Sequence, residues 1–242
     1  MTASAPASSA HTPLDLWERY GDRRADADAA SGVHGAFHWD WYERCGPGSE
    51  LLGALDGRTV VELGAGAGRQ AAHLAVTRGV AEVTALDSSP SMHRRGHKAY
   101  GAIPRLRIVR ADATAYLRKH PNTFDVAYSV FGAVDFSDPC RLLPAIATSL
   151  RAAGTLVFST LGRYRNGQEP ESEVRAARLP TALADGTPAT MERWVLSLQV
   201  WERLLARAGL EVVGVHTVHD AGRDHHPPMV TRIVRAVRPP GR

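Results

Sequence analysis

The sequence is poor in cysteine and has no long apolar run. Its 242 residues include only two cysteines, Cys45 and Cys140, which lie far apart along the chain. Neither a disulfide framework nor a C-x-x-C pair is therefore present, which fits a reducing cytoplasm. No apolar stretch approaches the roughly 18–20 residues that cross a membrane. Residues 1–10 also lack the basic start and the apolar stretch of a secretory signal. We expect a cytoplasmic protein without membrane contact.

The basic excess is modest and is not concentrated in one segment. The formal net charge is +4, and the arginines are scattered rather than striped with aromatic residues. That distribution does not favour a nucleic-acid partner. The length suits one large α/β domain with an added arm or lid. We expect a disordered tail over 1–10, an arm or lid over 11–56 and a main domain over 57–242, with an insertion at 161–198.

The most informative stretch is VVELGAGAG at 60–68, which a helical pattern follows at 70–75. Short apolar residues run into three alternating glycines, which predicts a strand, a tight turn and a helix. Glycines in such a turn allow positive φ angles and let a ligand approach the backbone closely. The helix N-terminus adds unpaired N–H groups and a partial positive charge, so the turn favours an anionic or hydroxyl-rich ligand.

The spacing of these glycines distinguishes between ligands. A dinucleotide-binding turn follows G-x-G-x-x-G, and its third glycine would fall at Arg69 here. Glu62 would repel a pyrophosphate, but it would attract an ammonium group or hold the loop by hydrogen bonds. The E-x-G-x-G-x-G pattern resembles the first motif of the class I S-adenosylmethionine (SAM) dependent methyltransferases; a glycine-rich turn of another doubly wound fold is the alternative. The resemblance implies that SAM contacts Glu62, Gly64, Ala65, Gly66 and Gly68.

An acid ends the next predicted strand, 82–87, about 20 residues after the glycines. This carboxylate, Asp87, can accept both ribose hydroxyls of a nucleoside, and each charge-assisted bond contributes roughly 1.5–3 kcal/mol. The alternative is that an acidic residue stands at this strand end by coincidence and binds no ligand. The glycine turn upstream makes this alternative less convincing. Ser88 follows directly, and Met92 in the next helix is expected to point back towards the adenosine.

The resemblance extends to the third and fourth predicted strands, 106–110 and 124–130. Family members carry an acid after the third strand that accepts the adenine amine, with the next backbone N–H on the ring. Asp112 and Ala113 occupy those places here. An N-cap of the following helix is the alternative role for this acid, and one residue can serve both.

The end of the fourth strand is where methyl donor and acceptor meet in the family. Many amino-directed nucleic-acid methyltransferases carry N/D-P-P-Y/F at this place, whereas this chain has Ser129, Val130, Phe131 and Gly132. The departure argues against a base-methylating enzyme and favours a small-molecule acceptor in an apolar pocket. We assign Ser129 and Val130 to the cofactor and Phe131 to the acceptor.

Residues 33–42 gather four aromatic side chains and two histidines within ten positions. These side chains can pack the arm onto the core, or they can form a lid over the ligand. The two roles are compatible. They contribute to the predicted substrate contacts together with positions elsewhere in the chain. The predicted contacts are Tyr20, Phe37, Trp39, Tyr42, Phe131, Trp194 and His225.

Four histidines and two aspartates lie within 216–228, which we expect to be a loop between strands at 210–215 and 231–237. Ligands on such a loop lack the i, i+4 spacing of a strong metal site, so no metal is predicted. A solvated hairpin loop and a contact to the acceptor are the two other interpretations. By position, the candidate general bases are His38, His219 and Asp135; a histidine suits proton removal near pH 7.

These features predict an α/β fold: a doubly wound, seven-stranded, mostly parallel sheet with an antiparallel last strand. An N-terminal helical arm and an insertion after the fifth strand complete it. The resemblance implies direct displacement of the SAM methyl group, with S-adenosylhomocysteine (SAH) as product. The acceptor would be O or N of a small aromatic or apolar metabolite of specialised metabolism, and the protein a monomer or homodimer. C-methylation of an electron-rich ring such as indole, a non-catalytic SAM-binding module and a NAD-dependent oxidoreductase are the alternatives.

Overall fold

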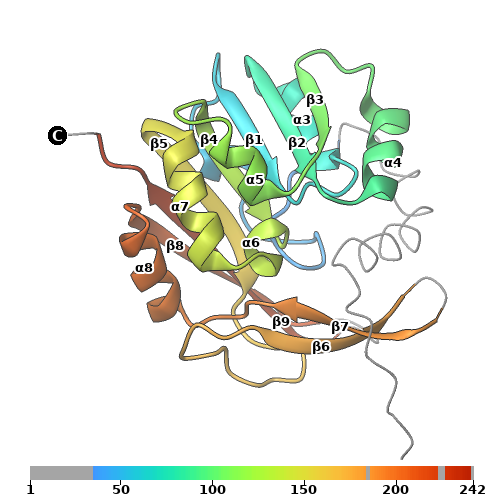
Figure 1. Ribbon diagram of the computed structural model, residues 1–242, viewed down its shortest axis with the longest axis vertical. Coiled ribbons are helices and arrows are strands. Elements are labelled where there is room, and N and C mark those ends of the chain that lie inside the picture. Colours follow the sequence, from blue (N-terminus) through green and yellow to red (C-terminus); the bar gives the residue numbers. More distant parts are fainter. Residues whose placement is uncertain (1–34, 184–185, 223–226, 241–242) are drawn as a thin grey trace, which may run out of the picture.

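The computed structural model in Figure 1 describes residues 35–183, 186–222 and 227–240. The predicted tail over 1–10 and the first part of the arm, which contains Tyr20, lie outside the described residues, as does His225. Among the helices that the structure describes, none is both long enough and apolar enough to cross a bilayer.

Seven strands form one sheet in the order β3-β2-β1-β4-β5-β9-β8. The strands are β1 (Thr59–Leu63), β2 (Glu82–Asp87), β3 (Leu106–Arg110), β4 (Phe124–Val130), β5 (Leu150–Leu161), β8 (Glu211–Asp220) and β9 (Met229–Val237). Strands β1 to β5 pair in parallel, and β9 pairs antiparallel with both β5 and β8. The predicted seven-stranded, mostly parallel sheet with a reversed last strand is confirmed.

Helices cover both faces of this sheet (Figure 1). They are η1 (Ser49–Leu52), α3 (Arg69–Thr77), α4 (Pro90–Tyr100), α5 (Ala113–Arg118), α6 (Ala133–Phe136), α7 (Pro139–Ser149) and α8 (Leu198–Arg207). Helices α5, α7 and α8 share one core cluster with the sheet, whereas α3 and the arm share another. Val61 belongs to the first cluster and Val60 to the second, because successive strand residues point to opposite faces.

Several helices begin directly after a parallel strand, which places their N-termini at one edge of the sheet. The Ser89 hydroxyl accepts the Met92 N–H at the start of α4, with Pro90 in the first turn. Asp112 accepts the Ala115 N–H at the start of α5. Ligands of doubly wound sheets bind at this carboxyl edge, so the fold places the candidate site there.

Two boundaries differ from the sequence prediction. Strand β8 continues to Asp220, so the predicted loop from 216 is wrong for its first five residues, and His216 and His219 pair with β9. The β-branched residues of 212–218 favour this longer strand. The apolar sequence continues from Val130 to Phe136 and predicts a longer fourth strand, but β4 stops at Val130 and Ala133–Phe136 form the one-turn helix α6.

The insertion after β5 contains an antiparallel hairpin of β6 (Ala177–Ala182) and β7 (Pro188–Arg193). The sequence analysis predicts an insertion at 161–198 but not this hairpin. The hairpin is tied to the main domain where the Trp194 N–H donates to the Asp135 carbonyl of α6, at 2.8 Å. Figure 1 shows it beneath α6.

Candidate active site

The glycine turn between β1 and α3 has the strained backbone that its sequence indicates. Gly64, Gly66 and Gly68 have φ angles of +75°, +57° and +81°, which residues other than glycine rarely adopt. A Cβ built on Gly66 would meet only the Met92 sulfur, at 3.9 Å. One side of the turn is therefore open, as the approach of a ligand to the backbone requires.

The structure brings Asp87 against this turn, as the spacing predicts. Its Oδ2 accepts the Gly66 N–H and its Oδ1 accepts the Ser89 N–H, both at 2.8 Å. Burial raises the pKa of Asp87, while the hydrogen bonds from Ser89, Gly66 and Ser88 oppose the rise. Each carboxylate oxygen can accept a further donor, so Asp87 can hold the turn and bind a ribose hydroxyl.

Glu62 is buried beneath the turn and holds the first turn of α3. Its Oε2 accepts the Ala71 N–H at 3.0 Å. Burial raises the pKa of Glu62 to about 8, against the opposing effects of the nearby Tyr128 hydroxyl and of the Ala71 N–H. Of the two roles that the sequence suggests, the structure supports the one in which Glu62 stabilises the loop.

The adenine side of the site is formed after β2 and β3. Asp112 serves as the N-cap of α5, its alternative role, and is exposed; Ala113 is buried as the first residue of that helix. Met92 is buried beside Gly66. Ser88 lies at the carboxyl end of β2, next to the Ser89 that caps α4. These positions are compatible with the adenosine contacts proposed for them.

Ser129 joins β4 to β1 instead of presenting its hydroxyl to a ligand. Its side chain is fully buried, donates to the Leu63 carbonyl at 2.8 Å and accepts the Val134 N–H at 3.4 Å. The predicted cofactor contact is therefore not available to this hydroxyl. Val130 is partly buried at the last position of β4.

The arm contributes an aromatic staple beneath the site. Phe37, Trp39 and Tyr128 pack together, with ring centroids 5.0–6.2 Å apart. Trp39 is fully buried and donates its Nε1–H to the Gly48 carbonyl at 2.9 Å. This is the packing interpretation of the aromatic stretch, and it leaves Trp39 no surface for the predicted substrate contact.

A small apolar cluster, which we call the acceptor-side cluster, lies where β4 and β5 end. It comprises Leu161, Val195, Met229, Trp41, Tyr42, Phe131 and Tyr164. The structure thus brings together two predicted substrate contacts, Tyr42 and Phe131, from distant parts of the chain. Phe131 has a φ of +46°, and such strained residues are enriched at ligand sites.

Sequence analysis missed three members of this region. Trp41 packs edge-on against Phe131 with ring centroids 5.0 Å apart, and only its place in the aromatic stretch could have indicated it. Tyr164 comes from the insertion, where no pattern singles it out. Arg193 lies with its guanidinium carbon 4.9 Å from the Trp41 ring, whereas the predicted contact, Trp194, packs towards the core of α7 and α8.

The three candidate bases do not come together. His38 has its Nδ1 3.8 Å from the Oδ1 of buried Asp40. Asp135 is fully buried and bound to Arg193; burial raises its pKa, while Arg193 and Thr160 oppose the rise. His219 is exposed on the edge strand β8 and, by alternation, faces away from the side on which its neighbour Val218 contacts the arm. His38 is the candidate whose partly exposed side chain has a buried carboxylate beside it.

One group of side chains that could bind a metal ion lies within the described residues. The ligand atoms of Asp40, Cys45 and Asp220 lie within 4.8 Å of one another. The Arg44 N–H donates to both oxygens of Asp40, and its guanidinium binds both oxygens of Asp220. Arginine therefore already compensates this acidic group.

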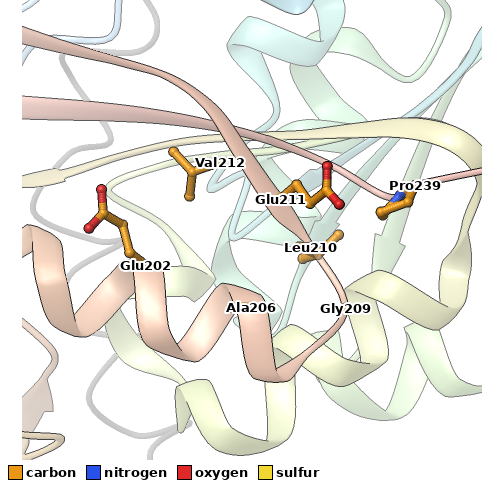
Figure 2. Close-up of a pocket in the computed structure, with 7 residues that line it drawn as sticks. All are labelled: Glu202, Ala206, Gly209, Leu210, Glu211, Val212 and Pro239. Atoms are coloured by element: carbon orange, nitrogen blue, oxygen red, sulfur yellow. The ribbon is translucent and has the colours of Figure 1, made fainter.

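Figure 2 shows a pocket in another part of the structure. It is lined by Glu202, Ala206, Gly209, Leu210, Glu211, Val212 and Pro239. These residues surround the end of α8 and the start of β8. Because β8 runs in the direction of the parallel strands, its start lies at the opposite edge from the glycine turn.

Comparison with known proteins agrees with the geometry. Residues 60–154 match the family model of a methyltransferase domain. By this match residues 60–154 form a methyltransferase domain, and the sheet around them has the fold of SAM-dependent methyltransferases. It is 30% identical over 175 residues to trans-aconitate 2-methyltransferase of Methylobacterium radiotolerans, an alignment that covers 70% of this chain. The chain spans 65% of that relative's length, and 64% of the same-named enzyme from Klebsiella pneumoniae.

Solved methyltransferase-fold structures cover nearly the whole chain. A 1,6-didemethyltoxoflavin-N1-methyltransferase of Burkholderia thailandensis, solved with its substrate and SAH, has a TM-score of 0.60 at 18% identity, covering 98% of this chain and 93% of its own. The [4+2]-cyclase SpnF has a TM-score of 0.63 at 17% identity, covering 94% and 95%. At these identities the likeness concerns the fold of the methyltransferase domain, and the acceptor must be argued from the site.

Proposed function

We propose that this protein transfers the methyl group of SAM to an oxygen or nitrogen of a small metabolite. The observation that carries the proposal is the position of the acceptor-side cluster next to the glycine turn. Gly132, which follows Phe131, is packed directly on Gly64: a Cβ on Gly64 would come within 2.8 Å of Gly132 backbone atoms. The name of the Methylobacterium relative, which specifies trans-aconitate, supports a small-molecule acceptor.

The proposed contribution of the chain is binding and alignment. SAM supplies an electrophilic methyl group on a good leaving group. The open side of the turn at Gly66 and the carboxylate of Asp87 bind and orient the nucleoside end. Phe131 and Trp41 hold the acceptor opposite and exclude water. Aligning two reactants in this way can contribute roughly 7–11 kcal/mol, so no metal or covalent intermediate is needed.

A general base is required only for an acceptor of high pKa, such as an alcohol. We assign that role to His38, because its Nδ1 faces the buried carboxylate of Asp40, which can orient the ring. Carboxylate and neutral amine acceptors react without prior proton removal. The role of His38 therefore depends on the acceptor class.

The test is SAH formation from SAM with pools of small carboxylic acids, phenols, alcohols and amines, with mass analysis of any methylated product. Transfer to O or N of a pool member is the expected result. A methyl group on ring carbon would favour the C-methylation alternative. SAM binding without transfer to any pool would favour a binding module or, as the shared fold with SpnF illustrates, another reaction on this fold.

A further inference from the structure

Arg193 and Asp135 form a buried ion pair at the acceptor side of the site. The Arg193 Nη2–H and Nε–H both donate to Oδ2 of Asp135, at 2.6 and 3.1 Å. The two side chains are 5% and 0% exposed. Arg193 comes from the last residue of β7 and Asp135 from α6, so the pair joins the inserted hairpin to the turn that carries Phe131.

The pair leaves one arm of the guanidinium unused. Both donated bonds of Arg193 go to one oxygen of Asp135, and the Thr160 hydroxyl beside that carboxyl opposes the rise in its pKa. Among the described residues, Nη1 of Arg193 donates no hydrogen bond. A guanidinium can donate five N–H groups, so Nη1 is available to a ligand.

Aromatic rings surround the guanidinium on the side of the acceptor. Its carbon lies 4.9 Å from the centroid of Trp41, 5.1 Å from Phe136 and 5.9 Å from Phe131. Rings at these distances favour a cation and shield it from water. In such a setting a charge-assisted hydrogen bond to an arriving anion is stronger than in bulk water. Two of these rings, Trp41 and Phe131, also belong to the acceptor-side cluster.

Charge balance indicates which ligand class completes this arrangement. Arg193 and Asp135 compensate each other, and the nearby Glu171 is bound by Arg175. Bound SAM adds the positive charge of its sulfonium. An acceptor carboxylate restores neutrality, whereas an ammonium adds a second positive charge to a water-poor site.

We propose that Nη1 of Arg193 binds a carboxylate of the methyl acceptor, which makes Arg193 the residue that selects acidic small molecules. This inference rests on the proposed function and specifies its substrate class. Arg193 orients the acceptor, and Asp135 is a positioning residue that fixes the guanidinium plane. A lysine cannot replace this geometry, because it offers a point charge instead of a planar fork held by Asp135.

The first experiment needs no variant. Binding of trans-aconitate, benzoate and the corresponding primary amides to the protein saturated with SAH is measured by calorimetry. At least one acid is expected to bind at least tenfold more tightly than its amide. Equal binding of each acid and its amide, or no acid binding, overturns the proposal. Absence of SAH binding instead overturns the proposed function, so the two failures are distinguishable.

The second experiment compares Arg193→Lys with Arg178→Lys, the same substitution at an exposed position of β6. Arg193→Lys is expected to raise KM for the preferred acid at least tenfold, with kcat within about threefold and SAM affinity unchanged. Arg178→Lys should match the wild type. An unchanged KM in Arg193→Lys overturns the proposal. Arg193→Lys could lose SAM binding through misfolding. In that case the double variant Asp135→Asn/Arg193→Met, which removes both charges of the pair, replaces it in the test. This double variant must lose the preference for an acid over its amide.

Discussion

Gly64 and Gly132 lie back to back, so the turn after β1 and the turn after β4 share one contact. A Cβ on Gly64 would lie 2.3 Å from the Ala133 nitrogen, and one on Gly132 would lie 2.4 Å from the Leu63 carbonyl oxygen. Ser129 donates to the same carbonyl. The turn proposed for the cofactor and the turn proposed for the acceptor are therefore fixed relative to each other by backbone packing.

Gly132→Ala should disturb both turns together. A Cβ on Gly132 would clash with the carbonyl oxygens of Leu63 and Gly64, at 2.4 and 2.7 Å. We expect a loss of about 1–3 kcal/mol in the free energy of unfolding and at least tenfold weaker SAM binding. Gly214→Ala is the matched control, because a Cβ there meets nothing within 4 Å. Denaturant unfolding and calorimetry measure the two effects; wild-type values for both in Gly132→Ala would refute the coupling.

The raised pKa of Glu62 predicts that the free energy of unfolding falls as pH rises. Its pKa is raised to about 8 in the folded protein, whereas an unfolded glutamate titrates at about 4.3. Between these values the folded state binds more protons, so this group lowers the free energy of unfolding by up to about 1.4 kcal/mol per pH unit. Glu62→Gln resembles the protonated form and should remove that slope. Urea unfolding at pH 5.5 and pH 8 checks it; identical pH slopes in variant and wild type would contradict the assignment.

Trp39 and Trp41 offer a matched pair of substitutions on one segment. Trp39→Phe should lower the free energy of unfolding by about 1–3 kcal/mol, because it leaves space in the core and removes the bond to Gly48. The KM for the acceptor should stay within twofold. Trp41→Phe should raise that KM several-fold with a smaller effect on stability. The reverse pattern in steady-state kinetics and thermal unfolding would mean that the aromatic arm has been misassigned.

The kcat/KM of His38→Ala separates the acceptor classes. With an alcohol acceptor and His38 as base, His38→Ala should lose about 10²–10⁴-fold in kcat/KM, because the proton acceptor is removed. With a carboxylate acceptor, His38→Ala should retain activity, because no proton has to be removed before transfer. His219→Ala, at an exposed position on β8, is the control. A large loss in His219→Ala would show that the wrong histidine was chosen.

The cofactor side of the site was predictable because its signals are local. The alternating glycines and the acid at the end of β2 meet as expected, since parallel strands end at one edge. The acceptor side was only partly predictable. Arg193 reaches Asp135 across 58 positions, and no local pattern marks an arginine for burial. His219 was misplaced because β8 extends further than its apolar run, and Trp39 because aromatic residues serve packing and binding alike.

The central claim is tested most directly by calorimetric titration of the wild type and Asp87→Ala with SAM, SAH and NAD⁺. The account predicts micromolar binding of SAM and SAH, no binding of NAD⁺, and at least tenfold weaker binding of SAM and SAH to Asp87→Ala, since each charge-assisted bond contributes roughly 1.5–3 kcal/mol. Binding of NAD⁺, or of none of the three, would contradict the assignment of the glycine turn and of every site built upon it.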